Sequence, residues 1–217
     1  MFPFYNATGM MIFFEEIAML REGLEKQEIL KILDKKLKKD YSFTSGSILG
    51  SMCTDPFDFG VEVYMKYISK NLGDPGLFIG TAELEEELVS EIGELYNGKN
   101  IIGTFTTGGS ESNLIAMRIA KELRPDIDYP EVVVPCSAHV SFDKAADLLG
   151  IKLKKANLNS NFELDLTHFE SLINKNTCGV VGIAGTTSLG LIDPIEDIGK
   201  LVEDKEIFFH IDAAFGG

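Results

Sequence analysis

The sequence predicts an α/β protein in which a mostly parallel sheet is covered by helices on both faces. From residue 101 onward, segments typical of strands and of helices alternate along the chain. Most of the expected strands are rich in consecutive apolar residues, as in CGVVGIAG at 178–185, and IKLKKANL at 151–158 is weaker. Continuous apolar runs are typical of parallel strands, because these are buried on both faces.

Length and composition favour a soluble globular protein. The chain has 217 residues, of which 45% are hydrophobic, and this is sufficient for a sizeable core. Its net charge of −14 repels nucleic-acid phosphates and anionic lipids, so we expect neither nucleic-acid nor membrane binding. Cys53, Cys136 and Cys178 are far apart and form no CxxC pair. We therefore expect no metal site, no disulfide and a cytoplasmic location.

The first 19 residues contain an apolar stretch that makes a poor signal peptide. No Lys or Arg precedes this stretch, Glu15 and Glu16 interrupt it, and it is too short to span a bilayer. Residues 19–40 follow with the apolar stripe of an amphipathic helix. We therefore expect translation to begin at Met19.

A connector and two further helices are expected before residue 101. Residues 41–56 are rich in Ser, Gly and Thr and are typical of a connector. One helix is expected over 58–71, and Thr81 is expected to cap another whose first turns are acidic. We assign residues 1–50 to an N-terminal helical segment with its connector, and residues 51–217 to the main domain.

The second half of the chain supplies the sheet and the helices that cover it. Strands are expected at 101–105, 131–136, 151–158, 178–185 and 207–211, and helices at 111–123, 142–149, 167–173 and 193–205. Thr167 and Glu170 have the spacing of a capping box. Asp193 and Pro194 suit the cap and the first position of the last helix.

The segment TFTTGGSESNLIAM at 104–117 carries the first chemical signal. A strand is expected to run into Gly108, Gly109 and Ser110, and a helix follows at once. Glycines allow a ligand close to the backbone, and a helix start offers unpaired N–H groups and a positive dipole end. The pattern is neither a Walker loop nor GxGxxG. It suits a phosphate cradle, and it is equally compatible with an ordinary glycine turn capped by Ser110.

Three further polar residues are expected at the carboxyl ends of strands, where ligands bind in open α/β sheets. His139 and Thr186 each follow an apolar strand, although either could simply complete a turn. Asp212 ends the last strand, where a partly desolvated carboxylate needs a cationic partner. No Lys or Arg is an obvious match, and a cationic ring fits better. A phosphate, a flat ring beneath an imidazole and a cationic nitrogen facing a carboxylate together describe pyridoxal 5′-phosphate.

The sequence resembles the group II pyridoxal-phosphate-dependent amino-acid decarboxylases, and most of all their archaeal L-tyrosine/L-aspartate branch. The resemblance runs from about Ser45 to Gly217. It rests on six ordered blocks: GSMCTDP, NLGDPGLFIGT, TTGGSESNL, AHVSFDKA, GIAGTTSLGLIDPIEDI and HIDAAFGG. It implies a three-layer α/β/α large domain of fold type I, preceded by an N-terminal helical arm.

The resemblance also implies roles for individual residues. Gly108, Gly109 and Ser110 would bind the cofactor phosphate. His139 would stack on the pyridine ring, and Ala214 would pack on the opposite face. Asp212 would pair with the protonated ring nitrogen, and Thr186 would lie near the ring edge. Leu77 and Phe78 are candidates for shaping the substrate site, and simple turns over the core would explain these residues equally well.

One part of the family pattern is absent from these 217 residues. The family holds its cofactor on a lysine some tens of residues beyond the HxDAA block, and no lysine here has that context. Lys144 is expected on the surface or at a dimer contact. The chain therefore resembles the N-terminal half of a longer enzyme, with an incomplete large domain, and we expect it to be inactive alone.

Several functions remain open from the sequence. The leading one is decarboxylation of an L-amino acid by a homodimer, from tyrosine to tyramine or from aspartate to β-alanine. Another is a different carbon–carbon or carbon–sulfur lyase of the same fold, such as a sphingoid-base phosphate lyase. A third is a truncated, non-catalytic paralogue that acts as a dimerisation partner.

Overall fold

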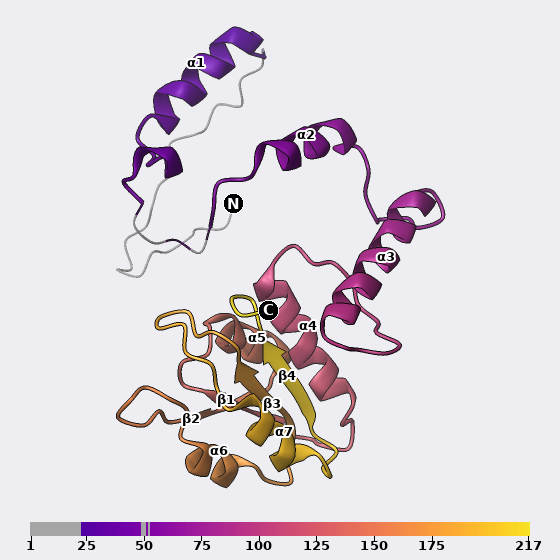
Figure 1. Ribbon diagram of the computed structural model, residues 1–217, viewed down its shortest axis with the longest axis vertical. Coiled ribbons are helices and arrows are strands. Elements are labelled where there is room, and N and C mark those ends of the chain that lie inside the picture. Colours follow the sequence, from indigo (N-terminus) through magenta and orange to yellow (C-terminus); the bar gives the residue numbers. More distant parts are fainter. Residues whose placement is uncertain (1–22, 49–50, 52) are drawn as a thin grey trace, which may run out of the picture. The chain divides into compact units, whose positions relative to one another are not determined.

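The computed structural model describes residues 23–48, 51 and 53–217. The chain divides into two compact units, over residues 1–71 and 72–217. Each unit is described separately below. Figure 1 shows their helices and strands.

The described part of the first unit consists of short helices. These are α1 (Lys26–Leu37), the 3₁₀ helix η1 (Phe43–Ser45) and α2 (Asp58–Tyr67). Helix α1 confirms the expected amphipathic helix from Lys26 onward, whereas the expected start at Met19 lies outside the described residues. So do Gly50 and Met52 of the GSMCTDP block. Helix α2 ends at Tyr67, four residues before the predicted end.

The second unit contains a parallel sheet and the helices around it. In chain order its elements are α3 (Ile79–Leu95), α4 (Gly109–Glu122), β1 (Glu131–Pro135), α5 (Ser141–Leu149), β2 (Lys152–Ala156), α6 (Leu166–Leu172), β3 (Thr177–Ile183), α7 (Ile195–Val202) and β4 (Phe208–Asp212). The strand order is β2-β1-β3-β4, and every neighbouring pair is parallel.

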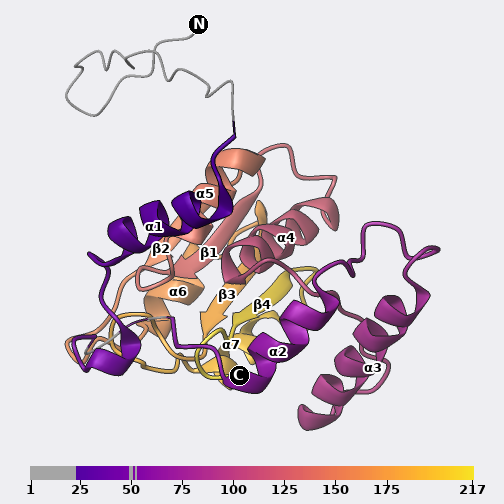
Figure 2. The same cartoon turned by 90° about the horizontal axis from the view of Figure 1, so that it is seen from above.

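Helices cover both faces of this sheet, as Figure 2 shows. Helices α4 and α5 pack on one face through a cluster that includes Met117, Phe142 and Val134. Helices α6 and α7 pack on the other face, through a cluster that includes Phe169, Ile198 and Val180. The all-buried β1 and β3 therefore lie between two apolar layers, which explains their continuous apolar sequences. The predicted three-layer arrangement is confirmed.

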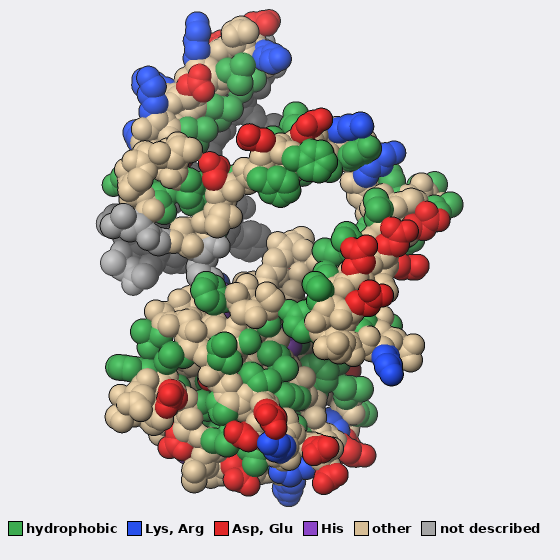
Figure 3. All heavy atoms as spheres, in the orientation of Figure 1, with side chains coloured by type: hydrophobic (Ala, Val, Ile, Leu, Met, Phe, Trp, Pro, Cys, Tyr) green, Lys and Arg blue, Asp and Glu red, His purple; other side chains and the backbone are tan. Residues whose placement is uncertain are grey.

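The surface of the second unit is acidic along one helix. Figure 3 shows Asp and Glu side chains gathered along α3. The exposed glutamates of this helix are Glu83, Glu86, Glu87, Glu91 and Glu94. Among the described residues, no helix is long and apolar enough to cross a membrane.

The predicted strand at 101–105 is wrong. This segment is irregular, and Ile102 is 95% exposed. The N–H of Phe105 and the hydroxyl of Thr104 both donate to Oε1 of Glu85 on α3, at 2.8 Å each. A side-chain carboxylate thus satisfies the backbone donor that a strand would pair with a neighbour.

Three predicted helix caps are also wrong. Helix α3 begins at Ile79, because the turn at Asp74 already directs the chain into it, so Thr81 lies inside the helix. Helix α6 is capped by Asp165, whose Oδ1 accepts the N–H of His168 at 3.0 Å, so Thr167 falls in its first turn. The side chain of Asp193 does not cap α7. It accepts the N–H of Ile183, at the end of β3.

Candidate active site at the carboxyl ends of the strands

The order of the strands places a topological switch point at the carboxyl ends of β1 and β3. The chain passes from β1 to β2 on one side and then returns to β3 on the other side. In open α/β sheets, ligands bind at such a switch point, beyond the carboxyl ends of the strands. His139 follows β1, Thr186 follows β3 and Asp212 ends β4, so all three predicted residues come from this edge of the sheet.

The start of α4 provides unpaired N–H groups at this edge. Gly108 has a φ of +152°, which favours glycine, and its carbonyl accepts the N–H groups of Glu111 and Ser112. Among the described residues, the N–H groups of Gly109 and Ser110 have no acceptor. A Cβ added to Gly109 would lie 4.0 Å from the Cβ of Ala214, so the helix start is close to the chain that follows β4. The arrangement can hold an anion.

The loop before α4 is fixed by its own side chains. Oε2 of Glu111 accepts the N–H of Thr107 at 2.6 Å and its hydroxyl at 2.7 Å. These hydrogen bonds, that of the backbone N–H first, lower the pKa of Glu111 below its ordinary value. The hydroxyls of Thr106 and Ser112 lie 2.8 Å apart. The helix start is therefore held in place before any ligand binds.

Asp212 is half-buried and is held by neutral donors. Its Oδ2 accepts a hydrogen bond from Nδ2 of Asn113 at 3.0 Å, and its Oδ1 accepts the N–H of Ala214 at 3.2 Å. Within the described part of the chain, no Lys or Arg forms an ion pair with this carboxylate. Asp212 can therefore receive a cationic group of a ligand.

His139 is exposed and is connected to Asp212 by two buried residues. Its Nδ1 accepts the N–H of Ser141 at 3.2 Å and lies 3.0 Å from the Ser141 hydroxyl. That hydroxyl in turn accepts a hydrogen bond from Nδ2 of Asn113 at 3.0 Å. The hydrogen bonds thus bring His139 and Asp212 into one network through Ser141 and Asn113.

His210 completes the network from the side of the sheet. Its Nε2 lies 2.9 Å from Oδ1 of Asn113, and its ring is 5.9 Å from the Phe142 ring, centroid to centroid. Burial lowers the pKa of His210 below its ordinary value, although the nearby charge of Asp212 opposes the shift. Burial therefore favours the neutral form of His210.

Sequence reasoning missed Asn113, Ser141 and His210. The signals that could have found them are positional. Asn113 lies about one helical turn after Gly109, and His210 precedes Asp212 by two positions and so lies on the same face of β4. Ser141 is the first residue of α5, immediately after the segment that carries His139.

Thr186 belongs to the same edge but not to this network. Its Oγ1 accepts the N–H of Leu191 at 3.1 Å, inside the loop that follows β3. In the described structure no hydrogen bond joins Thr186 to His139 or Asp212. The N–H of Ala184, two residues earlier, does donate to the carbonyl of Asp212 at 2.9 Å.

Leu77 and Phe78 lie in the turn that leads into α3. Their N–H groups both donate to the carbonyl of Asp74 at 3.0 Å. Leu77 is 76% exposed and Phe78 is half-buried. No hydrogen bond between described residues links either of them to the network around Asp212.

A small cavity lies beside the start of α4. It has a volume of about 320 Å³ and is lined from α4, from α5 and from the loop before α4. Its polar lining residues are Thr107, Ser110, Glu111, Ser141 and Lys144. Lys144, like the other lysines of the described chain, makes no hydrogen bond or ion pair with Asp212 or His139.

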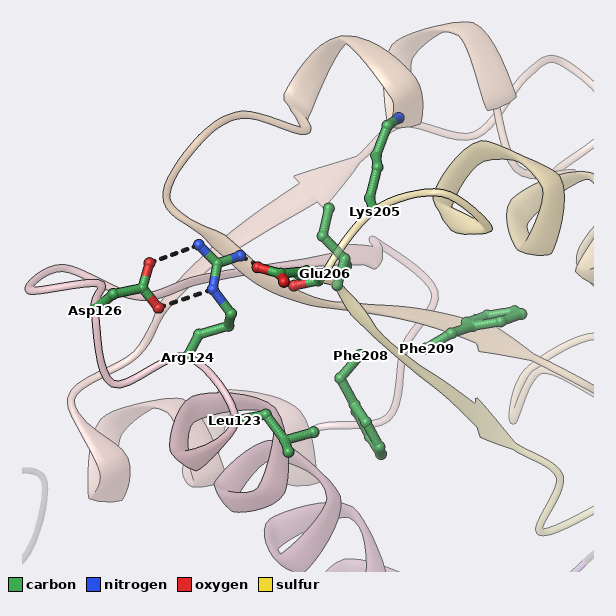
Figure 4. Close-up of a pocket in the computed structure, with 8 residues that line it drawn as sticks. Leu123, Arg124, Asp126, Lys205, Glu206, Phe208 and Phe209 are labelled. Carbon is green, nitrogen blue, oxygen red and sulfur yellow. Dashed lines mark hydrogen bonds and ion pairs between the residues drawn. The ribbon is translucent and has the colours of Figure 1, made fainter.

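A larger cavity, of about 480 Å³, lies near the start of β4, away from the carboxyl ends of the strands. Figure 4 shows that Arg124 faces Asp126 and the chain at Glu206. The guanidinium donates two hydrogen bonds to the Asp126 carboxylate, at 2.9 and 2.8 Å, and one to the carbonyl of Glu206 at 3.0 Å. Its charge is already paired, so Arg124 joins the segment after α4 to the segment before β4 and is not a free anion site.

Comparison with known proteins agrees with this geometry. Residues 80–217 match the family model described as the pyridoxal-dependent decarboxylase conserved domain. The chain is 47% identical over 197 residues to the L-aspartate/L-glutamate decarboxylase of Pyrococcus horikoshii. This match covers 91% of this chain and 51% of that protein. It is 48% identical over 176 residues to the probable L-tyrosine/L-aspartate decarboxylase of Methanothermobacter thermautotrophicus, with 81% and 48% covered. The chain thus spans about half the length of these relatives.

Solved structures share the fold at lower identity. The glutamate decarboxylase of Lactobacillus brevis gives a TM-score of 0.80 at 22% identity, over 90% of this chain and 49% of that one. Mouse CSAD in its apo form gives a TM-score of 0.81 at 21% identity, over 92% of this chain and 46% of that one. These likenesses confirm fold type I, and the match to the family model over residues 80–217 identifies the sequence family. The chain belongs to the pyridoxal-dependent decarboxylases.

Proposed function

We propose that the full-length protein is a pyridoxal-phosphate-dependent decarboxylase that acts on L-tyrosine, L-aspartate or both. The observation that carries this proposal is the carboxylate of Asp212, which lies at the end of β4 with neutral hydrogen-bond donors and no cationic partner in the described structure. The substrates are those in the printed names of the relatives, which include L-tyrosine/L-aspartate and L-aspartate decarboxylases.

The residues present suit pyridoxal phosphate. The unpaired N–H groups at the start of α4 would hold the phosphate, with Gly108, Gly109 and Ser110 as its binding residues. The carboxylate of Asp212 would pair with the ring nitrogen. His139 and Ala214 would enclose the ring, and Thr186 would lie near its edge. The closeness of Gly109 and Ala214 is consistent with one ligand contacting both.

Each of these residues has a defined task in the proposed reaction. When bound, the cofactor supplies a ring that accepts the electrons left behind as carbon dioxide departs. Asp212 keeps the ring nitrogen protonated, through a charge-assisted hydrogen bond worth roughly 1.5–3 kcal/mol. His139 fixes the plane of the ring, and the hydrogen bonds of Ser141 to its Nδ1 fix the imidazole itself.

We further propose that the protein is cytoplasmic and homodimeric, with the active site at the subunit interface. The three cysteines are free, as a reducing compartment favours. The exposed Leu77 and the half-buried Phe78 would supply apolar surface to the substrate site. Light scattering on the active protein tests the assembly, and a fully active monomer would contradict it.

A direct assay tests the function. The full-length protein should bind pyridoxal phosphate, seen by absorbance, and release carbon dioxide from L-tyrosine or L-aspartate. Asp212→Asn should reduce turnover at least about tenfold, because the ring nitrogen loses its anionic partner. Asp147→Asn, at an exposed position of α5, is the matched control and should leave turnover unchanged. Cleavage of a carbon–carbon bond without release of carbon dioxide would instead indicate another lyase.

A further inference from the structure

We infer that Asn113 is a positioning residue, which orients Asp212 and His139 through one directed set of hydrogen bonds. The inference rests on the proposed function for what those two residues contact. Asn113 is only 4% exposed, although asparagine side chains are mostly found on protein surfaces. Its side chain makes three hydrogen bonds to other side chains, and each partner comes from a different position at the site.

The chemistry of the partners fixes the orientation of the Asn113 amide. Its Nδ2 group has two hydrogens, and it donates one to Asp212 and one to Ser141. The reverse orientation would place the carbonyl oxygen of the amide against the Asp212 carboxylate, where two acceptors repel each other. Oδ1 must therefore face His210.

This orientation sets the proton position on His210, and the backbone N–H of Ser141 sets that on His139. Because Oδ1 of Asn113 is an acceptor, Nε2 of His210 must carry the hydrogen. The Ser141 oxygen accepts from Asn113 and lies 3.0 Å from Nδ1 of His139, so Ser141 connects the amide to the imidazole. Nδ1 of His139 accepts the N–H of Ser141 at 3.2 Å, so the hydrogen of the neutral ring lies on Nε2.

The same contacts hold the Asp212 carboxylate in one orientation. One oxygen is held by Asn113 and the other by the N–H of Ala214. Each carboxylate oxygen has two lone pairs, so both keep the capacity to accept a further hydrogen bond from a ligand. Without Asn113 the carboxylate would lose one of its two anchors, while the buried hydroxyl of Ser141 and the ring of His210 would each lose a partner.

Two measurements on the full-length protein test the role of Asn113. The first is ¹⁵N NMR of the histidine ring nitrogens without cofactor, with His210→Gln used to assign the His210 signals. Wild type should show His210 neutral, with its hydrogen on Nε2. The second is the dissociation constant for pyridoxal phosphate. We expect Asn113→Ala to lose the single His210 tautomer and to weaken cofactor binding about tenfold or more, because a hydrogen bond to a charged group is lost.

Two further variants serve as controls. Asn174→Ala removes an amide that donates to Glu131 at the other end of the strands, and it should leave both measurements unchanged. Asn113→Asp keeps an acceptor for His210 but places a second carboxylate beside Asp212. It should keep the His210 tautomer and still weaken binding, which provides a test if Asn113→Ala does not fold.

The outcomes separate this inference from the proposed function. A hydrogen on Nδ1 of His210 in wild type would overturn the inference, and this measurement does not depend on a variant of Asn113. So would unchanged cofactor affinity in Asn113→Ala or Asn113→Asp when wild type binds the cofactor. Failure of wild type to bind pyridoxal phosphate would overturn the proposed function, and with it the role of Asn113 in holding Asp212 for the cofactor.

Discussion

Ser110 lies in the first turn of α4, and its backbone N–H has no acceptor among the described residues. We expect Ser110→Glu to abolish binding of pyridoxal phosphate by the full-length protein, because a carboxylate there would repel the phosphate and compete for the same donors. Equilibrium dialysis measures the binding. Ser90→Glu, at an exposed position of α3, is the matched control. Unchanged cofactor occupancy in Ser110→Glu would place the phosphate elsewhere.

Asp193 is a buried carboxyl whose stability contribution depends on pH. Burial raises its pKa above the ordinary value, although its hydrogen bond from the N–H of Ile183, at 2.8 Å, opposes the shift. The folded state therefore binds the proton more tightly than the unfolded chain does. The stability from this proton is fully present below the unfolded pKa, about 4, and is lost as pH rises through the folded pKa.

Asparagine at position 193 removes this dependence while keeping an acceptor for Ile183. We expect the stability of Asp193→Asn relative to wild type to increase as pH rises from 4 to 7, measured by urea unfolding of the full-length protein. Asp193→Ala leaves the Ile183 N–H unpaired and should cost about 1–3 kcal/mol throughout. A stability of Asp193→Asn relative to wild type that decreases as pH rises would show that burial does not dominate the pKa of Asp193.

Sequence alone predicts Asp212 and His139 as candidates, because each is a polar residue at or just after the end of an apolar strand. It does not predict Asn113. An asparagine inside a helix is usually exposed, and the side it faces depends on how the helix packs against the sheet. The same limit applies to Thr186, whose hydroxyl is used inside its own loop.

At the scale of elements, the contact between α4 and β3 is tight enough to require glycine. A Cβ on Gly179 would lie 2.9 Å from the Cβ of Ala120 and 3.4 Å from the carbonyl oxygen of Phe208. We expect Gly179→Ala to destabilise the protein by about 1–3 kcal/mol, as overpacking does, and to weaken cofactor binding by displacing the helix that carries Asn113.

Gly199 on α7 is the matched control for this substitution. A Cβ there would meet only the Phe209 ring, at an ordinary 3.7 Å, and alanine favours a helix by about 1 kcal/mol over glycine. Gly199→Ala should therefore be neutral or stabilising, with unchanged cofactor affinity. Urea unfolding measures both variants, and equal effects at the two positions would show that the close approach of α4 is not needed.

The helices and the four strands of the sheet could be predicted because apolar periodicity is a local signal that burial enforces. The segment at 101–105 could not, since IIGTF has the composition of a strand but its backbone is held by Glu85. The caps at Thr167 and Asp193 failed for a similar reason. Several polar residues near a helix start can cap it, and tertiary contacts decide which one does.

At the scale of the whole molecule, β4 is the edge strand of the described sheet. It pairs with β3, and no other described strand lies beyond it. Ile211 on this strand is 41% exposed, and Phe215 just after it is 69% exposed. An unpaired apolar edge favours association with other chains. We therefore expect the 217-residue chain, produced alone, to be poorly soluble, and Ile211→Lys to reduce its association by placing a charge at the edge.

The 217-residue chain should also fail to decarboxylate L-tyrosine or L-aspartate. The family resemblance places the lysine that holds the cofactor beyond the HxDAA block, and within the described structure no lysine makes a hydrogen bond or ion pair with Asp212 or His139. Weak binding of pyridoxal phosphate is still expected, because the start of α4, His139 and Asp212 are present. The full-length protein should show both turnover and higher solubility, and replacing its expected downstream lysine with alanine should remove turnover without unfolding it. Carbon dioxide released by the purified 217-residue chain, free of longer protein, would contradict the prediction that turnover needs a lysine outside these residues.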